Sequence, residues 1–196
     1  NTNDGEGTLI AVLDNEFYLR GRYKDEHGAE QPGYSHVTFS PLADDVKTRI
    51  GNFTLMKNRA KNTYVYKTYQ TRIAECSEGQ EGSLYFNNKV PFYFDYAGDS
   101  YNGSSSGIKE DFNVESTIAL HGSHVASIAA GNDPLYKGIA PKAQLALMKV
   151  FSDVHETPAS ADAGNGDYAT FSEIGFIQAL EDAIALKVDA INVSIG

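Results

Sequence analysis

Short runs of consecutive apolar residues recur along this chain and set its architecture. Thr8–Leu13 (TLIAVL) follows a glycine and contains β-branched residues, a pattern typical of a strand that is buried on both faces. Three further runs have the same character: Val90–Tyr96, Gln144–Phe151 and Asp189–Ile195. Because Pro91 has no amide hydrogen, its strand is expected at a sheet edge or to begin after the proline.

Two helical patterns lie among these runs. Ser172–Leu186 has Ser172 as a candidate N-cap, Glu173 in its first turn, and apolar residues at helical spacing. His121–Ala130 consists largely of small apolar residues and precedes Gly131, which favours a buried helix that ends at the glycine. The apolar stripe of the predicted helix Ser172–Leu186 consists of Ile174, Ile177, Leu180, Ala183 and Ile184. Strand and helix thus alternate from residue 89 onward, which predicts an α/β fold with a mostly parallel, doubly wound sheet.

The stretch 15–88 interrupts this alternation. Within it, Pro41–Ile50 follows a serine and carries acids in its first turn, which predicts a helix. Asn62–Ile73 is rich in tyrosine and β-branched residues and predicts a strand. Ser100–Asn113 and Glu156–Asp167 are rich in turn-forming residues and predict loops.

Composition and charge exclude several classes of protein. The apolar runs are much shorter than the roughly 18 to 20 residues of a membrane-spanning helix, so no span is expected in this segment. Cys76 is the only cysteine, which excludes an internal disulfide and a cysteine-ligated zinc module. With 16 basic and 26 acidic residues the net charge is −10, which argues against nucleic acid as a partner. The acid-free basic stretch Lys47–Arg72, interleaved with tyrosines, keeps an anion-binding surface as a weaker alternative.

Two residues carry a pattern that suggests chemistry. Asp14 ends the first predicted strand, where parallel sheets form ligand crevices, although an Asx turn that only closes the strand is the alternative. His121 opens the small-residue helix, where a ring oriented by a carboxylate such as Asp14 can transfer protons. A metal held by His121 and His124 lacks a third ligand at a familiar spacing, so neither a metal nor another cofactor is predicted. His124 is instead expected to pack against the backbone.

Three separated blocks resemble the subtilisin-like serine proteases. They are LIAVLD at 9–14, HGSHVASIAAG at 121–131 with GIAPKAQLALMKVF at 138–151, and DAINVSIG at 189–196. A further block, NNKVPFYFDYAG at 87–98, is similar to the lactocepin-like and complement-cleaving cell-envelope proteinases of Gram-positive bacteria. The resemblance implies the N-terminal part of one subtilisin-like catalytic domain over 1–196, with an insert at 15–88 and core strands and helices at 89–196.

The resemblance also implies roles for individual residues. Asp14 matches the aspartate and His121 the general base of an Asp-His-Ser triad that hydrolyses peptide bonds. Ser194, Ile195 and Gly196 match the extended segment that binds the substrate backbone and forms a wall of the specificity pocket. The implied substrate is a protein or peptide, and the implied location is extracellular or attached to the cell surface.

The chain departs from the family pattern at several positions. The aspartate motif normally continues with a small residue and glycine, whereas Asn15 and Glu16 follow here. In the histidine block, Ser123 and Ser127 replace the usual threonine and glycine.

The family's nucleophile block, of the Gly-Thr-Ser-Met-Ala type, does not occur in these 196 residues. Ser194 cannot replace that serine because it belongs to the substrate-binding segment. We therefore expect the chain to be inactive by itself and to require the missing C-terminal half of the catalytic domain as a partner. We also expect Asp189–Ile195 to lie at an unprotected sheet edge. The alternative is a non-catalytic pseudo-protease or peptide-binding module that binds peptides without cleaving them.

Overall fold

The structure of the chain is a computed structural model that describes residues 3–15, 17, 19, 22–24, 30–32, 37–80, 82–97, 121–155 and 169–194. The strands are β1 (Leu9–Asp14), β2 (Arg22–Lys24), β3 (Glu30–Pro32), β4 (Phe92–Asp95), β5 (Gln144–Lys149), β6 (Phe151–His155), β7 (Ala169–Phe171) and β8 (Ala190–Val193). The helices are the 3-10 helix η1 (Val37–Phe39) and the α-helices α1 (Phe53–Ala60), α2 (Tyr64–Glu75), α3 (His121–Ala130) and α4 (Glu173–Leu186).

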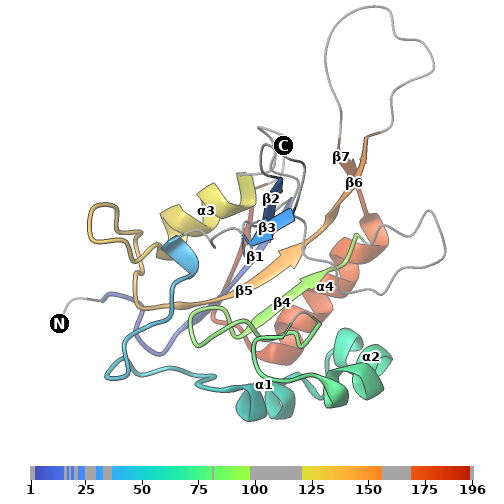
Figure 1. Cartoon of the computed structure of the whole chain (residues 1–196), viewed down its shortest axis with the longest axis horizontal. Helices are drawn as coiled ribbons and strands as arrows, with labels where there is room; N and C mark the ends of the chain where they lie inside the picture. Colours follow the sequence, from blue (N-terminus) through green and yellow to red (C-terminus); the bar gives the residue numbers. More distant parts are fainter. Residues whose placement is uncertain are drawn as a thin grey trace, which may run out of the picture.

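The centre of the fold is a parallel sheet with the strand order β4-β5-β1-β8. Figure 1 shows α3 over one face of this sheet, with α4, α1 and α2 on the other side. This arrangement confirms the predicted α/β fold with a mostly parallel sheet. β4 begins at Phe92, directly after Pro91, and occupies an edge of the described sheet. The proline therefore has the position that its missing amide hydrogen requires.

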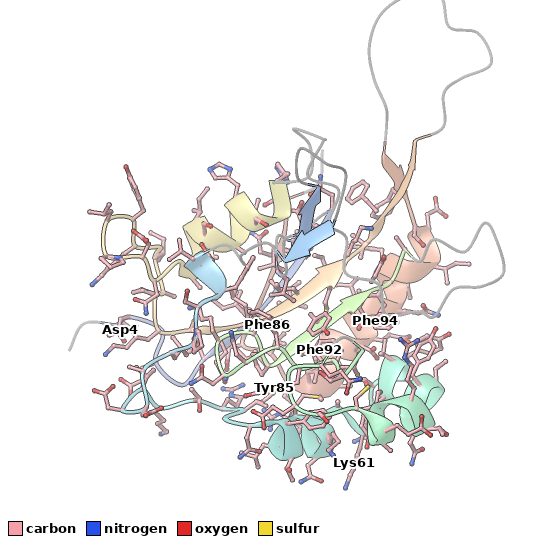
Figure 2. All side chains as sticks on the ribbon, in the orientation of Figure 1. Asp4, Lys61, Tyr85, Phe86, Phe92 and Phe94 are labelled. Carbon is pink, nitrogen blue, oxygen red and sulfur yellow. The ribbon has the colours of Figure 1, made fainter. Side chains whose placement is uncertain are left out.

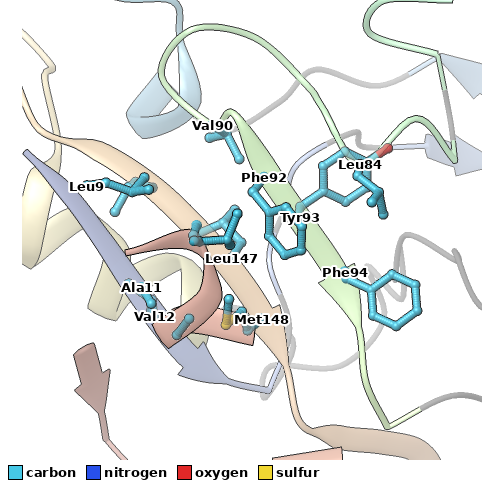
Figure 3. Close-up of a cluster of buried hydrophobic side chains, with 14 of the residues drawn as sticks. Leu9, Ala11, Val12, Leu84, Val90, Phe92, Tyr93, Phe94, Leu147 and Met148 are labelled. Atoms are coloured by element: carbon cyan, nitrogen blue, oxygen red, sulfur yellow. The ribbon is translucent and has the colours of Figure 1, made fainter. Parts of the chain in front are cut away.

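Residues from 15–88 and residues from 89–196 share one hydrophobic core. Phe39, Met56 and Tyr85 are almost completely buried together with Leu9 and Phe92. Figure 2 shows Tyr85 and Phe92 within the interior of the molecule. Figure 3 shows buried apolar side chains of β1, β5 and β4 in one cluster, to which Leu84 of the insert belongs.

The predicted helix over Pro41–Ile50 is wrong, because this segment consists of turns and irregular backbone. The Val46 amide donates a hydrogen bond to the Ala43 carbonyl within a turn, whereas other backbone groups of the segment are bonded to side chains that are distant in the sequence. Asn88 accepts a hydrogen bond from the Leu42 amide and donates one to the Leu42 carbonyl. Gln144 Oε1 accepts hydrogen bonds from the amides of Arg49 and Ile50 at 2.8 and 2.9 Å. These contacts satisfy the polar backbone without a helix.

The predicted strand over Asn62–Ile73 is also wrong, since α2 covers most of this segment. Thr63 caps α2 by accepting a hydrogen bond from the Tyr66 amide. The carboxylate of Asp182, on α4, accepts hydrogen bonds from the Tyr64 and Val65 amides. An acid at the N-terminus of a helix stabilises it, and this cap overrides the strand preference of the tyrosines. The preceding helix, α1, was not predicted from the sequence.

The predicted helix over Ser172–Leu186 is confirmed as α4, with the Ser172 hydroxyl accepting a hydrogen bond from the Gly175 amide. Its apolar stripe, however, does not face the core as a unit. Ile174, Ile177 and Ile184 are 73%, 57% and 71% exposed, whereas the buried positions are Gly175, Ala179, Asp182, Ala183 and Leu186. The helix therefore has a second apolar face, which the described residues leave uncovered.

β8 forms the other edge of the described sheet, where Ile191 and Val193 are exposed. The structure thus places an apolar strand at the edge, as predicted for Asp189–Ile195. The predicted loops Ser100–Asn113 and Glu156–Asp167 lie outside the described residues. Within the described part of the chain, no helix combines the length and apolar character needed to cross a membrane.

Candidate active site

The structure brings together the two residues singled out from the sequence, Asp14 and His121. Asp14 is the last residue of β1 and His121 is the first residue of α3, so the start of the helix lies at the carboxyl end of that strand. The Asp14 Oδ1 atom lies 2.7 Å from His121 Nδ1. The side chain of Asp14 is buried, whereas that of His121 is 50% exposed. The ring is therefore held on one side by a buried carboxylate and is open to solvent on the other.

This geometry fixes which nitrogen of the ring can react. A carboxylate at Nδ1 favours the tautomer with its proton on that atom, which leaves the Nε2 lone pair free to accept a proton. The carboxylate also stabilises the imidazolium ion that forms when Nε2 is protonated. The pair can therefore act as a general base, provided that a proton donor approaches Nε2.

Asn15 makes a second connection between the same two elements. Its backbone amide donates a hydrogen bond of 2.8 Å to Asp14 Oδ1. Its side-chain Oδ1 accepts a hydrogen bond of 3.1 Å from the Gly122 amide, in the first turn of α3. In the sequence, Asn15 is noticeable only as a departure from the family motif. Its position directly after Asp14 was the one signal that could have identified it.

A buried ion pair lies beside Asp14 in the sheet. The β1–β5 register places Lys149 next to Asp14, and the β4–β5 register places it next to Asp95. Lys149 Nζ lies 3.4 Å from Asp95 Oδ2, and both side chains are buried. Asp95 Oδ1 also accepts a hydrogen bond from the Ala97 amide at 3.0 Å. Asp14 Oδ2 has no hydrogen-bond partner among the described residues, whereas Oδ1 contacts both the Asn15 amide and His121 Nδ1.

The helix that carries His121 is also tied to the insert. Ser127 Oγ donates a hydrogen bond of 2.7 Å to the Ser123 carbonyl, and it lies 2.6 Å from Thr38 Oγ1. Thr38 belongs to η1 and is buried. The serine that replaces the usual glycine of the motif thus joins the middle of α3 to the segment 15–88.

The remaining candidate residues have different outcomes. His124 is exposed on α3, so its predicted packing against the backbone is wrong. The reason is its spacing: three residues after His121, it lies on the same outward-facing side of the helix.

Ser194 follows β8 and is exposed, and its hydroxyl contacts Asn192 Oδ1 at 3.0 Å. Since Leu13 pairs with Val193, Ser194 lies at the carboxyl end of the sheet, as Asp14 does. Ile195 and Gly196 lie outside the described residues.

No group of three or more potential metal ligands occurs within the described ranges. The site therefore consists of a buried carboxylate, a half-exposed histidine and the side chains that position them. These groups can transfer a proton, but they do not include the nucleophile that covalent catalysis requires.

Comparisons with known proteins identify relatives of this chain. The model of the subtilase family, a peptidase family, matches residues 5–196. A PII-type proteinase of Lacticaseibacillus paracasei is 32% identical over 198 aligned positions, which cover 98% of this chain and 8% of the relative. PI-type and PIII-type proteinases of Lactococcus lactis subsp. cremoris are each 33% identical over 136 positions, 66% of this chain and 6% of each relative. The chain therefore spans less than a tenth of the length of the relatives it matches.

Proposed function

Because the chain belongs to the subtilase family, we propose that it supplies the aspartate and the histidine of an Asp-His-Ser triad in a serine endopeptidase. The contact of 2.7 Å between Asp14 Oδ1 and His121 Nδ1 is the observation that carries this proposal. The match to proteinases from Lactococcus and Lacticaseibacillus supports it.

The proposed reaction follows from the half-exposed ring of His121, in which Asp14 occupies Nδ1 and Nε2 is the nitrogen left to accept a proton. A serine hydroxyl next to Nε2 loses its proton to the ring as its oxygen attacks the carbonyl carbon of the peptide bond. Asp14 stabilises the resulting imidazolium, which then gives the proton to the departing amine and leaves an acyl-enzyme. Water, deprotonated by the same nitrogen, hydrolyses the ester and regenerates the serine.

The serine and the oxyanion-hole donors are proposed to come from a C-terminal half of the catalytic domain outside these 196 residues. The absence of a Gly-Thr-Ser-Met-Ala-type block in the sequence supports this, as does the much greater length of the relatives. The uncovered isoleucines of α4 and the edge of β8 offer that half an apolar surface. In its absence the chain is expected to be inactive, since acyl transfer requires the nucleophile.

The proposed substrate is a protein or peptide, bound as an added strand along Ser194, Ile195 and Gly196. Ser194 is exposed and lies at the carboxyl end of the sheet together with Asp14, which supports this part of the proposal. The net charge of −10 argues against nucleic acid as a partner. By resemblance to cell-envelope proteinases, the enzyme is proposed to act outside the cell or attached to its surface.

A fluorophosphonate probe tests the proposal, because it reacts only with an activated serine. The complete enzyme is expected to be labelled, His121→Ala is expected to lose labelling, and the chain of 196 residues alone is expected to remain unlabelled. His124→Ala is the matched control, since it removes an exposed histidine from the same helix and should leave labelling intact. A complete, folded protein that binds peptides but resists the probe would instead establish the non-catalytic pseudo-protease.

A further inference from the structure

Two adjacent hydrogen bonds join the carboxyl end of β1 to the start of α3. Asp14 bonds to the side chain of His121, and Asn15 bonds to the backbone of Gly122. Both contacts therefore connect one dipeptide at the end of β1 with one dipeptide at the start of α3. One hydrogen bond constrains a single distance at the start of α3, whereas two neighbouring bonds also constrain its orientation there.

The surroundings of Asn15 favour a fixed geometry. Asn15 is 9% exposed and Gly122 is buried, so water competes little for their hydrogen bond. The Gly122 amide belongs to the first turn of α3, where backbone N–H groups have no partner within the helix. An amide oxygen is a favourable acceptor for such a group. Asn15 thus caps the helix from the position directly after β1, 107 residues away in the sequence.

We propose that Asn15 is a positioning residue of the triad, which holds the His121 end of α3 against the carboxyl end of β1. The inference rests on the proposed catalytic roles of Asp14 and His121. Asn15 itself touches neither the substrate nor the reacting atoms in this proposal. Its effect is to keep Nδ1 within hydrogen-bond distance of Asp14 and so to keep Nε2 aimed at the serine.

Asn15→Ala in the complete enzyme removes the acceptor and tests the proposal. We expect kcat and the rate of fluorophosphonate labelling to fall about 10- to 100-fold, because misplacement of a catalytic group by about 1 Å has effects of this size. KM should stay within about 2-fold, since the substrate is bound elsewhere, and the pH profile should be scaled down without a shift.

Two further variants separate positioning from folding. Asn52→Ala removes an equivalent cap, in which Asn52 Oδ1 accepts a hydrogen bond from the Leu55 amide at the start of α1. It should lose a similar amount of stability but retain wild-type kcat. Asn15→Asp keeps an acceptor at the same place, so its kcat at high pH should approach that of the wild type. Its added charge favours the imidazolium and should shift the acid limb of the profile to higher pH.

The outcomes distinguish this inference from the proposed function. If the wild type itself resists the probe, the proposed function fails. If the wild type is labelled and Asn15→Ala retains its kcat, or if Asn15→Asp is as slow as Asn15→Ala at high pH, the positioning role is overturned. Should Asn15→Ala not fold, Asn15→Ser, whose side chain is too short to reach Gly122, replaces it under the same criteria.

Discussion

Lys89 is a fully buried lysine whose hydrogen-bond partners in the described part of the chain include no carboxylate, and it leads to a sharp prediction about the pH dependence of stability. Its Nζ donates hydrogen bonds to the carbonyls of Pro141 and Ala143, at 2.9 and 2.6 Å. Burial lowers the pKa of Lys89 from 10.5 to about 7. The folded protein therefore gives up the lysine proton near neutral pH, whereas the unfolded chain keeps it until about pH 10.5.

The difference between the pKa of Lys89 in the folded and unfolded states sets the direction and the size of the change in stability with pH. Between pH 7 and 10 the unfolded state binds more protons than the folded state, so the free energy of unfolding rises with pH. The slope is at most about 1.4 kcal/mol per pH unit, and the full shift corresponds to about 5 kcal/mol. This is an upper limit, because the two carbonyl acceptors favour the ammonium form.

Urea unfolding of the wild type and of Lys89→Met at several pH values tests this prediction. Methionine has a similar length and no charge, so the difference between the two proteins isolates the lysine. We expect the wild type to gain stability relative to Lys89→Met from pH 7 to 10. The range ends there because burial raises the pKa of Tyr85 to about 12, so above pH 10 tyrosine ionisation favours the unfolded state. If the free energies of unfolding of the wild type and of Lys89→Met change in parallel from pH 7 to 10, the prediction is refuted.

Three further predictions concern other buried groups. Asp14→Asn in the complete enzyme should reduce kcat by about 10⁴-fold without unfolding it, as measured with a peptide substrate, because the ring loses its orienting carboxylate. Gly175→Ala should lower the free energy of urea unfolding by about 1–3 kcal/mol, since a Cβ there lies 2.4 Å from the Tyr96 carbonyl oxygen, whereas the exposed Ile177→Ala should change it by less than about 0.5 kcal/mol. Burial raises the pKa of Asp182 above 3.8, so the folded state binds more protons just above that pH, and the stability of the wild type relative to Asp182→Asn should fall as pH rises through the raised pKa.

The parts of the fold that the sequence predicts are those set by local apolar pattern. β1, β4, β5 and β8 come from runs of apolar residues, and α4 comes from a helical repeat with its own N-cap serine. The mistakes occur where a distant polar side chain decides the local structure. The N-terminus of α2 is capped by Asp182, which is 118 residues away from Tyr64. No window of sequence around α2 contains this acid.

The candidate site shows the same division. Asp14 and His121 stand out because a carboxylate ends a buried strand and a histidine opens a helix, and a parallel sheet brings such positions to one edge. The contacts of Asn15 and Ser127 are different, because each depends on how α3 crosses the sheet and η1. Motif comparison marks both residues as departures, but only their partners in the structure reveal what they do.

Buried polar side chains attach the irregular part of the insert to the sheet at a point away from the candidate site. The segment 40–52 lacks regular structure. The side chain of Gln144, at the start of β5, accepts hydrogen bonds from two backbone amides of this segment and donates one to the carbonyl of Ile50. This attachment lies at the amino end of the sheet, whereas Asp14 lies at the carboxyl end of β1. The insert reaches the histidine helix through another contact, between Thr38 and Ser127. Changes in the segment 40–52 should therefore affect stability first, and changes at Thr38 are the ones expected to alter the position of α3.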